Sequence, residues 1–241
     1  MDRDELLRVL QAFESEGLEY VLIGATAMGF HGLVRATEDV DLVVRATPEN
    51  IDRLRRAFRT VYADDPHIDE IRAADLLGDY PSIRYYPPSG DLFFDVLTRL
   101  GEIATFDTIE GEVKEIEEIR VRVATPAALY RMKKGTIRPL DWRDAAALRG
   151  GSDCEWRTDV PVQKFHSVAE MNAVPVQTSQ DRPFDRFVRH CERYRAISPR
   201  TYPRGVFRFR TIDEAQAARE LVAAKLHRPG APETTPDSPI G

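Results

Sequence analysis

Cysteine is scarce in this chain of 241 residues: Cys154 and Cys191 are the only two. Two cysteines are too few for the disulfide framework of a small secreted protein or for a zinc site built on thiolates. The five histidines are scattered along the sequence and suggest no metal cluster. These features favour the reducing cytoplasm and a chemistry that does not depend on thiols.

Long apolar runs are also missing. No stretch approaches the ~20 apolar residues that a membrane-spanning helix needs. The composition, 42 % hydrophobic and 31 % charged, is ordinary for a soluble protein. Residues 1–5 are acidic overall and lack the apolar segment of a secretory signal. We therefore expect a cytoplasmic protein with no membrane partner.

Positive charge is sparse in the first part of the chain. Residues 152–241 hold 14 of the 34 basic and 12 of the 40 acidic residues, which leaves 20 basic against 28 acidic elsewhere, a charge of −8. Within 182–210, nine arginines stand against Asp185 and Glu192. Such a segment can face nucleic acid or an acidic surface of its own chain. The sign of its charge alone does not decide between these two partners.

The spacing of apolar residues predicts alternating helices and strands up to about residue 150, where 150–152 (Gly-Gly-Ser) is typical of a linker. A hairpin is expected over 82–97, with a Pro- and Gly-containing loop. The predicted helices cover residues 3–16, 25–31, 47–61, 125–134 and 139–148, and the predicted strands cover 20–23, 40–44, 82–86, 92–97, 112–116 and 119–123.

A short internal repeat marks the C-terminal part. Lys164–Ala173 and Arg208–Ala217 share the order basic, Phe, basic or His, Ser or Thr, aliphatic. Each copy predicts a strand that ends in an N-capped helix, and each is too short to bury a core alone. We expect a small, mainly helical module over 151–228 and a disordered Pro-, Thr- and Ser-rich tail over 229–241.

The main chemical signal is a pair of acids in an apolar strand. Asp39 and Asp41 are separated by one residue, so their side chains point to the same face of the strand. Asp is disfavoured in strands, and two like charges on one face repel each other. On a solvated edge strand the two acids would be tolerated. A divalent cation would instead offset both the low strand propensity and the repulsion, because Mg²⁺ binds carboxylate oxygens and shares its coordination shell with phosphates.

A glycine turn precedes this strand. The apolar run 20–23 ends at Gly24, and a helix is predicted to follow. Gly24 would let the backbone approach a phosphate closely, at a helix N-terminus with free N–H groups. The hydroxyl of Thr26 is expected to contact a phosphate oxygen. A plain turn is the alternative, but the turn, the helix-sized gap and the acidic strand together favour nucleotide binding.

A third carboxylate is expected from Asp95, which lies inside the apolar strand 92–97. A carboxylate in such a strand is costly unless it is paired or bound to metal. A salt bridge to Arg84 is the alternative. We favour metal binding by Asp39, Asp41 and Asp95, which makes these three the predicted catalytic residues.

These motifs resemble the minimal nucleotidyltransferases of the polymerase-β superfamily. Residues 24–27 and 35–42 are similar to the abortive-infection and MenT-like toxins of bacterial toxin–antitoxin systems, whose pattern is Gly-Gly/Ser followed by Arg-x-Thr-x-Asp-hydrophobic-Asp-Leu. The segment 130–144 is similar to a second block of that family. The resemblance covers roughly residues 1–150 and implies an α+β fold with a mixed sheet and flanking helices.

By this resemblance Lys133 would contact the triphosphate, Asp144 would be a further acid of the site, and Arg35 would take part in nucleotide binding. The chain departs from the pattern at Ala25, where Gly or Ser is usual, and at Leu140, where Lys is usual. Both departures concern affinity for nucleotide and leave the acidic residues intact.

The expected activity is transfer of a nucleoside monophosphate from a nucleoside triphosphate to an acceptor hydroxyl, with two Mg²⁺ ions. The resemblance implies an RNA acceptor, with the tRNA 3′ end as the leading case. A small molecule of the aminoglycoside type or a protein hydroxyl is the alternative acceptor, and a catalytically silent binding module is a third possibility. The C-terminal module is expected to be antitoxin-like and to restrain the enzyme by packing on it in cis or in trans. Arg side chains near Asp39 and Asp41 could then occupy the position of the metal or the triphosphate. The alternative is that these arginines hold the RNA substrate.

Overall fold

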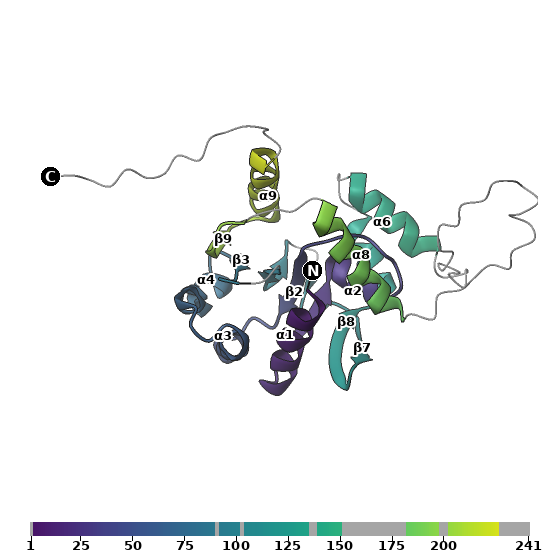
Figure 1. Ribbon diagram of the computed structural model, residues 1–241. Coiled ribbons are helices and arrows are strands. Elements are labelled where there is room, and N and C mark those ends of the chain that lie inside the picture. Colours follow the sequence, from purple (N-terminus) through teal and green to yellow (C-terminus); the bar gives the residue numbers. More distant parts are fainter. Residues whose placement is uncertain are drawn as a thin grey trace, which may run out of the picture.

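The computed structural model describes residues 2–89, 92–101, 104–134, 139–150, 182–197 and 202–226 (Figure 1). Most of its helices and strands agree with those predicted from the sequence. The short elements over 66–77 and 99–105 and the helix over 183–197 were not predicted. The first repeat copy and the tail lie outside the described residues. The helices are α1 (Arg3–Ser15), α2 (Gly24–Phe30), α3 (Pro48–Val61), the 3₁₀ helix η1 (Pro66–Glu70), α4 (Ala73–Leu77), α5 (Pro126–Lys133), α6 (Pro139–Gly150), α8 (Pro183–Ile197) and α9 (Ile212–Leu226). The strands are β1 (Tyr20–Ile23), β2 (Asp39–Val44), β3 (Ser82–Tyr86), β4 (Phe93–Leu97), β5 (Arg99–Leu100), β6 (Ala104–Thr105), β7 (Gly111–Ile116), β8 (Ile119–Ala124) and β9 (Gly205–Phe209).

Seven strands form one mixed sheet in the order β7-β8-β1-β2-β4-β3-β9, and β5 pairs with β6 separately. The pairs β1–β8 and β2–β4 are parallel, and the other neighbours in the large sheet are antiparallel. The predicted hairpin over 82–97 is confirmed by the antiparallel β3–β4 pair. The expected α+β class, with a mixed sheet and flanking helices, is therefore confirmed.

The two faces of the central strands have different characters, because neighbouring strand residues point to opposite sides. One face packs on α1 and α3, where the ring of Phe58 lies 4.8 Å from that of Tyr85 and 5.0 Å from that of Phe94. The other face carries Asp41 and Asp95, which are direct partners in the β2–β4 pair. The aromatic core thus supports the acidic face from behind.

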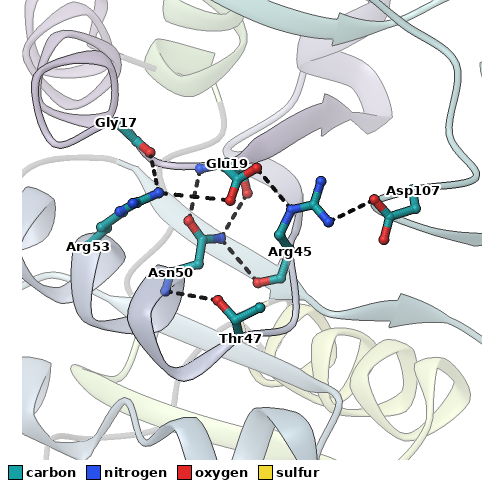
Figure 2. Close-up of polar contacts among 7 residues, drawn as sticks. All are labelled: Gly17, Glu19, Arg45, Thr47, Asn50, Arg53 and Asp107. Carbon is teal, nitrogen blue, oxygen red and sulfur yellow. Dashed lines mark hydrogen bonds and ion pairs between the residues drawn. The ribbon is translucent and has the colours of Figure 1, made fainter.

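A buried amide fixes the register of β1 and β2 (Figure 2). Asn50, which is 1 % exposed, accepts a hydrogen bond from the N–H of Glu19 at 2.9 Å. Its amide nitrogen donates to the carbonyl oxygens of Glu19 and Arg45 at 2.9 and 3.1 Å. Glu19 precedes β1 and Arg45 follows β2, so Asn50 joins these two strands at one end. The same register sets Ile23 against Asp41 at the other end.

The elements after residue 181 pack on those before residue 150. β9 pairs with β3 from Ser82–Phe209 to Tyr86–Gly205 and forms one edge of the sheet. α8 lies against α2 (Figure 1). Its fully buried Phe187 is so close to α2 that a Cβ at Gly29 would come 2.7 Å from Cδ1 of the ring. The C-terminal elements therefore complete the sheet and the core, and their role as a regulatory module stays a prediction.

Among the described residues, none of the helices combines the length and the apolar character that crossing a membrane would require.

Candidate active site

Three carboxylates meet on the face of the sheet that is turned away from α1 and α3. Asp41 and Asp95 are cross-strand partners, and Asp39 lies two residues before Asp41 on the same face. One ligand oxygen from each of the three lies within 4.8 Å of the others. Asp39 and Asp95 are buried, while Asp41 is partly exposed. Carboxylates so close together repel each other strongly unless cations lie between them.

Gly24 makes room for one of these carboxylates. It lies at the turn from β1 to α2 with a φ of +68°, in the left-handed region that favours glycine. A Cβ at this position would lie 2.7 Å from Cγ of Asp41. Any other residue would therefore displace the Asp41 carboxylate, which gives the glycine a steric reason in addition to the phosphate approach expected from the sequence.

Two arginines neutralise part of the acidic cluster. Arg84 is opposite Asp95 in the β3–β4 register and donates to its two oxygens, from Nε at 2.6 Å and from Nη2 at 3.0 Å. Arg219 of α9 places its Nη2 2.5 Å from Asp39 and 2.6 Å from Asp95. Asp95 thus both forms the salt bridge with Arg84 and takes part in the acidic cluster. Within the described part of the chain, Asp41 receives neither a hydrogen bond nor an ion pair.

The pKa values of the two β2 acids move in opposite directions. Burial acts to raise the pKa of Asp39, but the charge of Arg219 and a hydrogen bond from the Thr37 hydroxyl outweigh it and hold this pKa below its ordinary range. For Asp41, shielding from water comes first and the charges of Asp39 and Asp95 add to it, which raises its pKa to about 7. Asp41 is therefore the acid whose ionised form most lacks a partner.

The donor set fits a divalent cation. Its three carboxylates supply the oxygen ligands that Mg²⁺ takes in proteins. The guanidinium of Arg219 lies between Asp39 and Asp95, which shows that a positive group can be held there. The ionised Asp41 has further need of positive charge. The described residues thus offer a site for metal ions on the acidic face of β2 and β4.

Two threonines position the acidic strand. The hydroxyl of Thr37 donates to the Asp39 carboxylate. Thr26 is completely buried, and its hydroxyl donates to the backbone oxygen of Asp39 at 3.0 Å. The expected contact between Thr26 and a phosphate does not fit this position, because the hydroxyl is out of reach of a ligand and already has an acceptor. The sequence showed the hydroxyl beside a glycine turn but not the direction in which it points.

Lys133 lies in a second charged cluster beside the first. Its Nζ is 2.9 Å from Asp141 Oδ1 and 2.8 Å from Asp144 Oδ2, and both acids are buried. Arg35 forms an ion pair with Asp144 at 3.4 Å. Lys133, Asp144 and Arg35, which the resemblance selected separately, therefore form one connected group. Asp141 completes it; this acid lies in the second block of the resemblance, 130–144, but it was not among the predicted site residues.

The two clusters border one cavity of about 210 Å³. Its acidic wall comes from β2 and β4, and Arg35, Arg84, Lys133 and Arg219 supply positive charge. α9 lines another side through Ile212, Ala215, Gln216 and Arg219. Carboxylates for a metal next to basic side chains for phosphate oxygens are the arrangement that binding of a metal–triphosphate requires.

Comparison with known proteins agrees with this chemistry. A protein-family model described as nucleotidyl transferase AbiEii toxin, type IV toxin–antitoxin system, matches residues 8–137. This chain belongs to the AbiEii nucleotidyltransferase toxin family. The resemblance to abortive-infection toxins predicted from the sequence is thereby confirmed, and the protein is a nucleotidyltransferase. A search of curated proteins found no match.

The sequence predicted an arginine of the C-terminal module near the acidic residues, but it did not identify Arg219 as that residue. Arg219 falls outside the arginine-rich segment 182–210, and nothing around it marks it as a site residue. Its contact with Asp39 depends on β9 pairing with β3, which brings α9 over the cluster. A strand pairing between such distant segments has no local signal in the sequence. The AbiEii match ends at residue 137, before this segment begins.

Proposed function

We propose that this AbiEii-family enzyme is a Mg²⁺-dependent toxin that transfers a nucleoside monophosphate from a nucleoside triphosphate to the 3′ end of tRNA. The observation that carries the proposal is the acidic cluster of Asp39, Asp41 and Asp95, with ligand oxygens within 4.8 Å of one another, beside a cavity that basic side chains also line. When bound, Mg²⁺ would neutralise the phosphates and lower the pKa of the attacking hydroxyl.

The residues of this chain have separable tasks in such a reaction. Asp39, Asp41 and Asp95 would hold two Mg²⁺ ions, and Gly24 keeps the space for the Asp41 carboxylate. Lys133 would contact the triphosphate, with Asp141 and Asp144 fixing its ammonium group. The acceptor oxygen bonds to the α-phosphorus, the bond to pyrophosphate breaks, and the hydroxyl proton is released. Positioning and charge neutralisation account for most of the rate enhancement in this type of reaction.

The acceptor is inferred from the family rather than from a contact. Toxins of this class support an RNA acceptor, while the site chemistry alone is equally suited to a hydroxyl of a small molecule or a protein. The charge of −8 outside residues 152–241 disfavours RNA binding by that part of the chain unless positive charge gathers at the cavity. Arg35, Arg84 and Lys133 line the cavity, but each is ion-paired with an acid, so the cavity carries no excess of positive charge for RNA.

One labelling experiment separates these acceptors. The full chain is incubated with each of the four labelled nucleoside triphosphates, Mg²⁺ and total RNA, and the label is followed by denaturing gel electrophoresis. We expect label in tRNA, at its 3′ end, and none with the Asp41→Asn variant. Label in protein or in a small acceptor would change the proposed acceptor but not the type of reaction. No transfer with any triphosphate or acceptor would reject the proposed function.

We also propose that the C-terminal elements restrain this activity. The support is the ion pairing of Arg219 with Asp39 and Asp95, which puts a C-terminal side chain in the acidic cluster. The rival role, in which the arginines of 182–210 capture RNA, predicts that charge-removing variants lower transfer. Cutting the chain after residue 150 is an unsuitable test, because it removes a sheet strand and the buried Phe187.

A further inference from the structure

α9 narrows the cavity that a nucleotide would enter. The cavity measures about 210 Å³, and Ile212, Ala215, Gln216 and Arg219 of α9 form part of its wall. Sites for small ligands and cofactors usually measure about 300–1,000 Å³. The cavity is therefore smaller than most sites of this kind while α9 remains where it is.

The charge of Arg219 competes with a metal. Asp39, Asp41 and Asp95 together carry three negative charges when ionised, and Arg84 and Arg219 supply two positive ones. A divalent ion that reached Asp39 and Asp95 would lie within a few ångströms of the Arg219 guanidinium, because the same oxygens bind both. The like charges of the ion and of Arg219 therefore oppose occupation of the cluster by both.

The strand before α9 is firmly anchored. β9 pairs with β3 along its whole length, and Arg208 donates to Asp75 at 2.6 Å and to the backbone oxygen of Glu70 at 2.5 Å. Just before β9, the ring of Tyr202 stacks on that of Tyr86 at 5.2 Å. These contacts lie outside the acidic cluster, so they can persist when the cluster changes.

α9 itself is lightly packed. Among its described side chains, from Ile212 to Leu221, Ala215 alone is buried, and Leu221 is 64 % exposed. The Nε of Arg219 is buried and has no hydrogen-bond partner within the described residues. The ion pairs of Arg219 are thus the main polar attachment of α9 to the sheet, and even this attachment leaves one donor unsatisfied.

We propose that α9 is a lid hinged at the end of β9, and that Arg219 occupies the cation position of the active site while the lid is closed. Divalent metal and Arg219 compete for Asp39 and Asp95, so binding of the metal–triphosphate opens the lid and β9 stays in the sheet. This regulation rests on the proposed function for its purpose, but the competition itself concerns only residues of this chain and a metal ion.

Metal affinity tests the competition directly. Mn²⁺ is titrated into the full chain and free Mn²⁺ is followed by electron paramagnetic resonance. Arg219→Gln is expected to bind Mn²⁺ at least tenfold more tightly than the wild type. Arg210→Gln is the matched control, because it removes the same charge from an exposed residue between β9 and α9, and it should bind like the wild type. Unchanged or weaker binding by Arg219→Gln would overturn the proposal.

Hydrogen exchange on the wild type gives a second reading that needs no variant. Because a helix of 15 residues is only marginally stable away from the sheet, saturating Mn²⁺ should speed exchange of the amides of 212–221 at least tenfold and leave those of 205–209 unchanged. Equal protection of α9 with and without Mn²⁺ would mean that Arg219 belongs to the loaded site, and the lid would be rejected. If Arg219→Gln fails to fold without metal, this measurement alone decides.

The lid and the proposed function can fail separately. Suppose that Arg219→Gln binds Mn²⁺ more tightly and α9 opens, but no nucleotide is transferred to any acceptor. The lid proposal would then be supported and the proposed function rejected. Transfer by the wild type, together with unchanged Mn²⁺ affinity and lower activity in Arg219→Gln, would keep the function and assign Arg219 to substrate binding.

Discussion

At the scale of single residues, the three acids of the cluster differ in their hydrogen-bond and ion-pair partners. Asp39 and Asp95 each have arginine partners, while Asp41 receives neither a hydrogen bond nor an ion pair within the described residues. The sequence predicted all three acids as metal ligands, but their contributions to stability differ in sign. An ion pair stabilises the charged form of an acid, whereas a neighbouring like charge destabilises it.

Replacing Asp41 should therefore stabilise the metal-free protein. In EDTA at pH 8, Asp41→Asn is expected to melt a few degrees above the wild type, which corresponds to about 1 kcal/mol or more for a chain of this size. Asp39→Asn should melt lower, because Arg219 and Thr37 lose their acceptor. Both variants should lose transfer activity. A lower melting temperature for Asp41→Asn would contradict this view of the cluster.

The stability that Asp41→Asn gains over the wild type should increase as the pH rises. The pKa of Asp41 rises from 3.8 to about 7 on folding, so the folded state holds this proton more tightly than the unfolded state. The wild type thus has its full stability below pH ~4 and loses it, relative to Asp41→Asn, as the pH rises through 7. Melting curves of both proteins in EDTA from pH 4 to 8 measure this difference.

Substitutions at Gly17 and Gly24 distinguish the effect of backbone strain from that of a steric clash. Gly17 and Gly24 have nearly the same φ, +63° and +68°, but a Cβ at Gly17 meets nothing within 4 Å, and one at Gly24 meets the Asp41 carboxylate. Gly17→Ala should cost about 1 kcal/mol of stability and leave transfer activity unchanged. Gly24→Ala should cost more and abolish transfer. Urea unfolding and the labelling assay check both; equal effects would remove the steric argument for Gly24.

At the scale of elements, local patterns predicted most helices and strands but not their neighbours. Thr47 and Pro48 start α3 as expected, because an N-cap and a first-turn proline act within a few residues. The parallel pairing of β2 with β4 sets Asp41 beside Asp95. The only sign of this pairing in the sequence was that both strands carry acids predicted for the same site. The β3–β9 pairing left no local trace, so the place of Arg219 could not be predicted.

The β1–β2 pair depends on one buried side chain. Asn50→Ala would leave the N–H of Glu19 without its partner, while the carbonyls of Glu19 and Arg45 would lose one bond each and keep those from the N–H groups of Arg45 and Thr47 (Figure 2). We expect a loss of about 1–3 kcal/mol, since unsatisfied buried groups are costly. Urea unfolding measures it, with the exposed Glu49→Gln as a control that should change stability by a few tenths of a kcal/mol. A loss no larger than that of the control would assign the register to other contacts.

At the scale of the whole molecule, the C-terminal elements and the nucleotidyltransferase core share one hydrophobic interior. Phe187 of α8 is fully buried beside α2, the helix that begins at Gly24. Phe187→Ala should lower the stability of the entire chain by about 3–5 kcal/mol, in a single transition. Phe207→Ala, at a residue 38 % exposed on β9, should have a much smaller effect.

Calorimetry distinguishes one unit from two. If Phe187→Ala gives two separate transitions and the larger one is unmoved, the residues after 150 form an independent unit, as the sequence alone suggested. A single shifted transition would mean that the protein cannot lose its C-terminal elements and keep its active site.

The edge position of β9 has a consequence for how the molecule folds. Its partner β3 ends at Tyr86 and β9 begins at Gly205, so roughly 120 residues must be synthesised before the two strands can meet. Until then the edge of β3 offers unpaired backbone groups, which favour association with other chains. The acidic cluster is complete in sequence by residue 95, long before Arg219 is made. During translation the carboxylates of the acidic cluster therefore emerge first, and the side chain that covers them is among the last to arrive.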